Sequence, residues 1–67
     1  MPRIEDTDQA KAVALYEFRK IHPYGVKVRM NVQRMSDVWI VRLSFGSPVR
    51  EMEYRIDATN GQAWKIK

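Results

Sequence analysis

The sequence predicts a single α+β domain in which one N-terminal helix packs on a four-stranded antiparallel meander sheet. Two observations lead to this fold class. Apolar residues recur every three or four positions up to residue 22, and every second position from residue 26 onward. Three short segments rich in turn-forming residues interrupt the alternating part, which divides it into four strands joined by hairpin turns. Since 67 residues suffice for one domain, residues 1–67 are expected to form one unit.

The helix is expected over residues 6–22. Asp6 is a suitable N-cap, and Gln9 three positions later completes a capping-box pattern. Pro23 disfavours helical geometry in the residue before it, so the helix is expected to end at residue 22. The residues predicted to form the buried stripe are Ala10, Ala14, Phe18 and Ile21.

The strands are expected at residues 26–34, 38–45, 49–57 and 62–67. In each strand one side of the alternation is apolar, and the helix is the element available to cover that side of the sheet. The side chains predicted to face the helix are Val26, Val28, Met30, Val32, Trp39, Val41, Leu43, Phe45, Met52, Tyr54, Ile56, Trp64 and Ile66. Ile40 is the exception, because its position places an apolar side chain on the opposite, charged face.

Composition argues against catalysis, metal binding and cofactor binding. The chain has no cysteine and one histidine, so disulfides, thiolate sites and a zinc site of the usual kind are excluded. The three glycines stand alone in separate turns and form no phosphate-binding loop. His22 is a conceivable catalytic base or pH switch, but its place at a helix C-terminus favours a structural role. We therefore expect a protein that is not an enzyme and that uses no cofactor.

Two stretches of the sequence resemble the PepSY domain. Trp39–Leu43 matches the aromatic-led strand of that family, and Glu53–Ala63 matches the strand and turn that precede its last strand. The alanine-rich segment Ala10–Leu15 is similar to the helix that opens such domains. The sequence departs from the family pattern at Asn60, where Thr is usual, and at Ala63, where Val is usual.

The resemblance implies the same helix-over-sheet fold and a non-enzymatic, protein-binding or regulatory function. PepSY domains are linked with peptidase propeptides, with the regulation of proteases, and with sensory or binding modules in envelope proteins. No residue of this chain matches an inhibitory motif of that family, so no site is carried over.

The positive charge is concentrated in the middle of the chain, where residues 25–50 carry five basic side chains and one acidic side chain. By alternation, Lys27, Arg29 and Arg42 lie on the sheet face away from the helix, and Lys65 and Lys67 are expected to join them. A basic face of this kind raises nucleic-acid binding as the alternative function. Glu51 and Glu53 on the third strand are expected to pair with these cations instead, as charges do across neighbouring strands.

The remaining expectation is a protein partner or self-association as a homodimer. The candidate partner-binding residues are Lys27, Arg29, Ile40, Arg42 and Lys65. No apolar stretch is long enough to span a membrane. The N-terminal residues lack the apolar core of a signal peptide, so we expect a cytoplasmic protein if the chain is complete, and an envelope or secreted protein if a targeting segment was removed.

Overall fold

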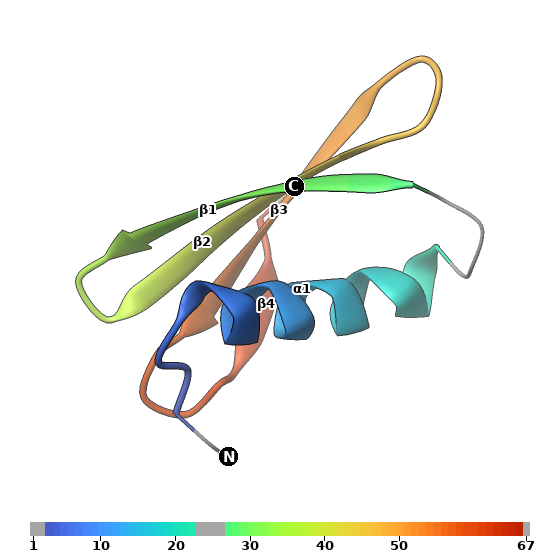
Figure 1. The fold of residues 1–67 in the computed structure, drawn as a ribbon. Helices are drawn as coiled ribbons and strands as arrows, with labels where there is room; N and C mark the ends of the chain where they lie inside the picture. The colour runs from blue at the N-terminus through green and yellow to red at the C-terminus, as the bar shows by residue number, and fades with distance from the viewer. Residues whose placement is uncertain (1–2, 23–26, 67) are drawn as a thin grey trace.

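The predicted helix-on-sheet architecture is confirmed by a computed structural model, which describes residues 3–22 and 27–66 (Figure 1). The helix, α1 (Thr7–Ile21), lies across one face of an antiparallel sheet. The strands are β1 (Val28–Met35), β2 (Val38–Phe45), β3 (Arg50–Asp57) and β4 (Ala63–Lys65). Their order in the sheet is β1-β2-β3-β4, which is the predicted meander. Val26 and Lys67, for which the sequence predicts strand positions, lie outside the described residues.

The two ends of α1 are set by the residues that the sequence singles out. Asp6 is the N-cap, and its Oδ1 accepts a hydrogen bond from the Gln9 N–H at 2.8 Å. The Gln9 side chain reaches back to the N–H of Glu5 rather than to that of Asp6, so the capping box is displaced by one residue. At the other end the N–H of His22 donates to the carbonyl oxygen of Phe18 at 2.8 Å.

The buried stripe of α1 ends differently from the prediction. Ala10, Ala14 and Phe18 are buried, but Ile21 is 53% exposed, so its predicted place in the core is wrong. His22 continues the four-residue spacing instead. Its ring centroid lies 4.9 Å from that of Phe18 and 4.8 Å from that of Phe45. The imidazole therefore packs at the end of the core, which agrees with the structural role that the sequence favours for His22.

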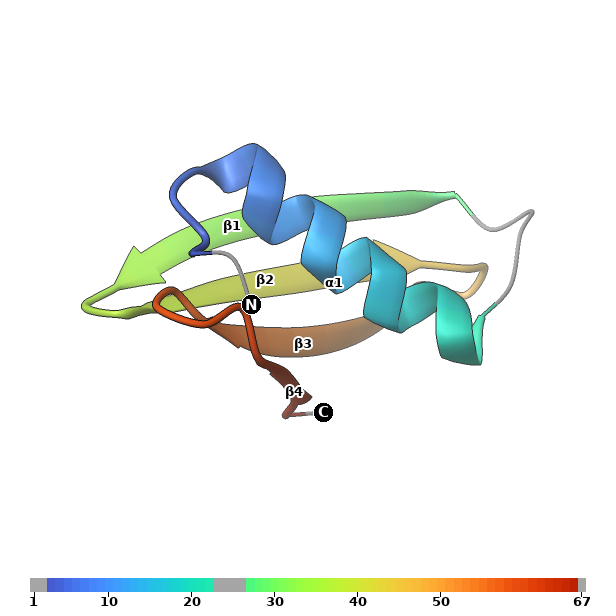
Figure 2. The ribbon, with the colours of Figure 1, turned by 90° about the horizontal axis from the view of Figure 1, so that it is seen from below.

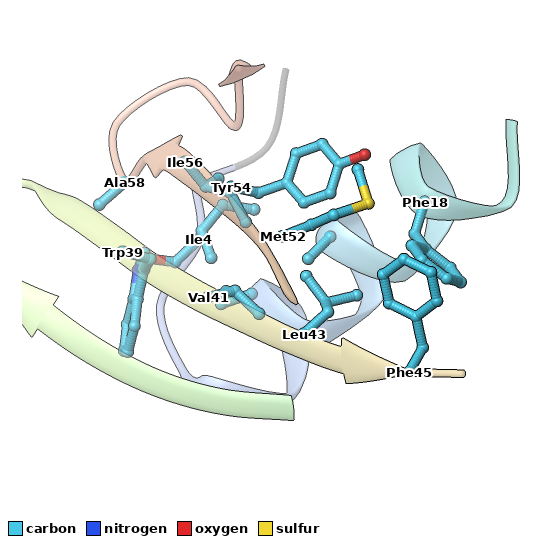
Figure 3. Close-up of a cluster of buried hydrophobic side chains, with 12 residues drawn as sticks. Ile4, Phe18, Trp39, Val41, Leu43, Phe45, Met52, Tyr54, Ile56 and Ala58 are labelled. Carbon is cyan, nitrogen blue, oxygen red and sulfur yellow. The ribbon is translucent and has the colours of Figure 1, made fainter. Parts of the chain in front are cut away.

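The core between helix and sheet is closed at its other end by the N-terminal segment (Figure 3). Ile4 is buried, and its N–H donates to the carbonyl oxygen of Ala58 at 2.9 Å. The carbonyl oxygen of Ile4 accepts the indole Nε1–H of Trp39, also at 2.9 Å. These bonds satisfy buried polar groups, which are costly to leave unpaired. The sequence pattern identifies neither Ile4 nor Ala58 as a core residue.

The last strand faces the opposite way from the prediction. Ala63 pairs with Ile56 and Lys65 pairs with Tyr54, so these two β4 residues lie on the helix side. Trp64 pairs with Arg55 on the other side and is 42% exposed. The assignments of Trp64 and Ile66 to the core, and of Lys65 to the outer side, are therefore wrong.

The turn between β3 and β4 explains this register. The N–H of Asp57 donates to the carbonyl oxygen of Gln62, and the N–H of Gly61 donates to that of Asp57, both at 2.8 Å. Gly61 has a φ of 76°, which glycine adopts without steric strain. The turn thus fixes Ala63 opposite Ile56. A slip of one residue would exchange the two faces of β4.

We expect the β3–β4 turn to make stability depend on acid. The Asp57 carboxylate accepts hydrogen bonds from the hydroxyl and the N–H of Thr59, and these lower the pKa of Asp57 from its ordinary value of 3.8. A group with a lowered folded-state pKa stabilises the fold above its unfolded-state pKa and loses that effect as the pH falls. Asp57→Asn should therefore weaken the loss of stability below about pH 4, measured by urea denaturation at neutral and acid pH.

Thr59→Ala is the matched variant, because it retains the carboxylate and removes the hydroxyl donor. The stability that Thr59→Ala loses at acid pH should lie between the losses of the parent and of Asp57→Asn. An equal acid dependence in all three proteins would contradict this account of the turn.

Candidate functional site

The candidate site is the sheet face turned away from α1, which we call the outer face. The strand registers place four rows of side chains across this face, and the two middle rows extend to β4 or to the residue after it. The first of these two rows consists of Gln33, Ile40, Arg55 and Trp64. The second consists of Asn31, Arg42, Glu53 and Ile66, where the Ile66 N–H donates to the Glu53 carbonyl oxygen at 2.9 Å.

Charge on the outer face is paired across and along the strands. Glu53 lies between two arginines, with 3.2 Å from its Oε1 to Arg42 Nε and 3.2 Å from its Oε2 to Arg55 Nε. Burial tends to raise the pKa of Glu53, but hydrogen bonds from Arg55 and Arg42 outweigh it and hold that pKa below 4.5. The predicted pairing of Glu53 with the basic second strand is confirmed. Its second cation is Arg55 on the same strand, in place of a lysine on β4.

The structure brings together three of the five predicted partner-binding residues. Arg29, Ile40 and Arg42 share the outer face. Lys27 is exposed immediately before β1. Lys65 lies on the helix side of the sheet, opposite Tyr54, and is separated from the others by the sheet itself. Ile40 is only 8% exposed, so it supports the outer face more than it offers contact area.

Three exposed apolar residues of the outer face are absent from the predicted site, namely Met35 at the β1–β2 turn, Trp64 and Ile66. Ile66 lies two positions after Trp64 on the same face and is 46% exposed. Arg55 is the register partner of Trp64 on β3. Ile40 is the next residue of the same row. We call Ile40, Arg55, Trp64 and Ile66 the Trp64 patch. The signal that reveals it is the length of the Asp57–Gln62 turn and not the apolar alternation, which is the same in either orientation of β4.

The hollow on the outer face is small, and the described residues group no metal ligands there. A hollow of about 30 Å³ lies between Asn31, Gln33, Ile40 and Arg42, which is far below the size of ligand pockets. Within residues 3–22 and 27–66 no three His, Asp or Glu side chains are grouped so as to hold a metal ion. No helix in the described part of the chain is long and apolar enough to cross a membrane.

Together, the fold and the site define an α+β helix-on-sheet domain with an aromatic and arginine-bearing outer face. No protein-family model, curated protein or solved structure matches the chain.

Proposed function

We propose that this protein is a non-enzymatic protein-binding module that contacts its partner through the Trp64 patch. The observation that carries the proposal is the exposed indole of Trp64 beside Ile66 and Arg55. Tryptophan and arginine are enriched among the residues that dominate the energy of protein interfaces. An exposed apolar cluster with a polar surround is also typical of interaction surfaces.

The PepSY resemblance supports a regulatory kind of module, acting on a peptidase or on another envelope protein. One of the stretches that carry the resemblance extends from Glu53 to Ala63 and leads directly into Trp64. In the structure this stretch forms the second half of β3 and the turn that orients the Trp64 patch. The proposed binding surface and the resembling segment are therefore adjacent.

We expect Trp64→Ala to weaken partner binding by roughly thirtyfold or more, which corresponds to a contact worth about 2 kcal/mol. The parent, Trp64→Ala and Tyr16→Ala proteins are immobilised, and proteins captured from cells of the source organism are compared at low and high salt. Tyr16 is the control because it is an exposed aromatic residue on α1, away from the outer face. A specific partner should be lost with Trp64→Ala alone, and its affinity is then measured with the purified protein.

Capture of the same proteins by the parent and by Trp64→Ala would contradict the proposed surface. Self-association through the patch is tested in parallel by light scattering over a range of concentrations. A homodimer that uses this surface should become monomeric in Trp64→Glu. Ile40→Glu is a poor substitute, because it would bury a carboxylate in the sheet and destabilise the fold.

Nucleic-acid binding is the second candidate, and one specific observation favours it. Trp64 shares the outer face with Arg29, Arg42 and Arg55, and single-stranded nucleic acids bind where exposed aromatic rings accompany cations. The pairing of Arg42 and Arg55 with Glu53, together with Glu51 on the same strand face, weakens this attraction. A salt-sensitive quenching of Trp64 fluorescence by single-stranded oligonucleotides would favour this candidate over a protein partner.

A further inference from the structure

The free edge of β1 is the second surface that this fold leaves open. β1 pairs with β2 alone, so among the described residues its other edge has no strand partner. This edge is eight residues long, whereas the edge strand on the other side of the sheet, β4, has three. A long unpaired edge presents backbone donors and acceptors to an added strand.

The hydrogen-bond pattern identifies the residues that present these groups. The carbonyl oxygen of Glu53 accepts a hydrogen bond from the Ile66 N–H, so the N–H and C=O groups of Glu53 point toward β4. In an antiparallel sheet these groups alternate in direction, so those of the preceding and following residues point toward β2. The same alternation applies in the β2–β3 and β1–β2 registers. The backbone N–H and C=O groups of the odd-numbered β1 residues therefore bond to β2. The residues whose backbone groups point to the free edge are Val28, Met30, Val32 and Arg34.

An apolar groove lies beside this edge on the helix side. α1 crosses the sheet obliquely and leaves the first residues of β1 uncovered by its C-terminal half (Figure 2). The resulting groove has a volume of about 1020 Å³. Its apolar lining includes Leu15 of α1, Val28 and Met30 of β1, and Phe45 of β2. Leu15, Val28 and Met30 are half-buried, so an added strand would bury them further.

The charge of the groove selects among possible occupants. Arg19, Lys27 and Arg29 contribute to the lining, which contains no carboxylate among the described residues. The β1 strand of a second copy carries Arg29 and Arg34 and no acidic residue, so it would bring further cations and no carboxylate to this edge. Like charges opposite each other destabilise strand pairing. An acidic segment is favoured instead, because its carboxylates would lie beside Lys27 and Arg29.

We infer that the groove between α1 and the free edge of β1 binds an extended acidic segment of another protein, which adds to the sheet as a fifth strand. Backbone hydrogen bonds to Val28 and Met30 would supply affinity, and alternate apolar side chains would occupy the groove. Carboxylates on the intervening residues would meet Lys27 and Arg29. This site lies at the opposite edge of the sheet from the Trp64 patch and does not rest on the function proposed for that patch.

The test uses two short synthetic peptides, one with alternating valine and glutamate and one with alternating valine and lysine. We expect the parent protein to bind the glutamate peptide at least about tenfold more tightly, measured by fluorescence anisotropy at low salt. The double variant Lys27→Glu/Arg29→Glu should reverse this preference. Such a reversal requires a folded protein, so it cannot result from unfolding.

Val28→Pro tests the strand pairing itself. Proline is tolerated at the first residue of a strand, and here it removes an N–H that points to the free edge while the β1–β2 pairing remains. We expect this variant to keep its circular dichroism spectrum and to lose binding of the glutamate peptide. Trp64→Ala should bind that peptide as the parent does, which separates this site from the Trp64 patch.

Amide chemical shifts give the position of the bound peptide. Shifts centred on Val28 and Met30 would support strand addition. The inference is overturned if the shifts centre on Trp64 and Ile66, if the two peptides bind equally, or if Lys27→Glu/Arg29→Glu leaves the preference unchanged.

Discussion

Phe18→Ala is expected to lower the free energy of unfolding by about 3–5 kcal/mol. The Phe18 side chain is fully buried, meets the Phe45 ring edge-on at a centroid distance of 4.9 Å, and stacks on His22. Truncation of a buried phenylalanine to alanine costs about 3–5 kcal/mol. A domain of this size has a total stability on the order of 3–10 kcal/mol, so the loss removes much of it. Circular dichroism and urea denaturation measure the effect.

Ile21→Ala is the control, because Ile21 is also an apolar helix residue but is exposed in the structure. We expect a change of no more than about 0.5 kcal/mol, since exposed positions contribute little. Similar losses in the two variants would show that the helix packs through Ile21, as the sequence pattern predicts, and would contradict the His22 arrangement.

Trp39→Ala is expected to have an effect of similar size. Trp39 is 6% exposed, and the Arg34 guanidinium lies 4.9 Å from its ring centroid. The substitution removes a large buried ring, at a cost of about 3–5 kcal/mol. It also leaves the carbonyl oxygen of Ile4 without its donor, which adds about 1–3 kcal/mol. Thermal denaturation followed by circular dichroism should show no cooperative transition.

The other tryptophan provides the matched comparison. Trp64→Ala should retain a cooperative transition near that of the parent, and its remaining fluorescence should be that of a buried indole. Trp39→Phe retains most of the ring volume and loses the hydrogen bond, so it should unfold at lower urea concentration and emit as an exposed indole. Equal destabilisation by Trp39→Ala and Trp64→Ala would contradict the register of β4.

The fold could be predicted from the sequence because the two apolar periods are unambiguous over long segments. Along β2, Trp39, Val41, Leu43 and Phe45 alternate with residues of the outer face, and all four are buried as expected. At the start of α1, Asp6 acts through a local hydrogen bond that its sequence position already suggests. Both features are signalled by residues close together in the chain, although the burial of β2 comes from packing against distant residues such as Ile4 and Phe18.

The orientation of β4 could not be predicted in the same way. Apolar alternation groups Trp64 with Ile66 but does not reveal which side of the sheet they occupy. That side is decided by the turn, where Gly61 and Gln62 bond to Asp57. The helix-side positions are held by Ala63 and Lys65, and Ile4 completes the core at that end of the molecule. The sequence therefore predicts a candidate site that includes Lys65 and omits Trp64.

The end of the helix stripe shows a different difficulty. Isoleucine is more hydrophobic than histidine, so Ile21 is the natural choice for the last buried position. The structure places His22 there because its flat ring packs against both Phe18 and Phe45, which also contact each other. The geometry of ring contacts with Phe45, which is distant in sequence, is not contained in a hydropathy pattern.

The anchoring of Ile4 by Ala58 and Trp39 has a consequence for biosynthesis. A ribosome makes residue 4 well before residue 58. The helix and the β1–β2 hairpin therefore emerge before the segment that closes the core over them. Folding as one unit must await the synthesis of Ala58, and until then the nascent apolar surface is a target for chaperones.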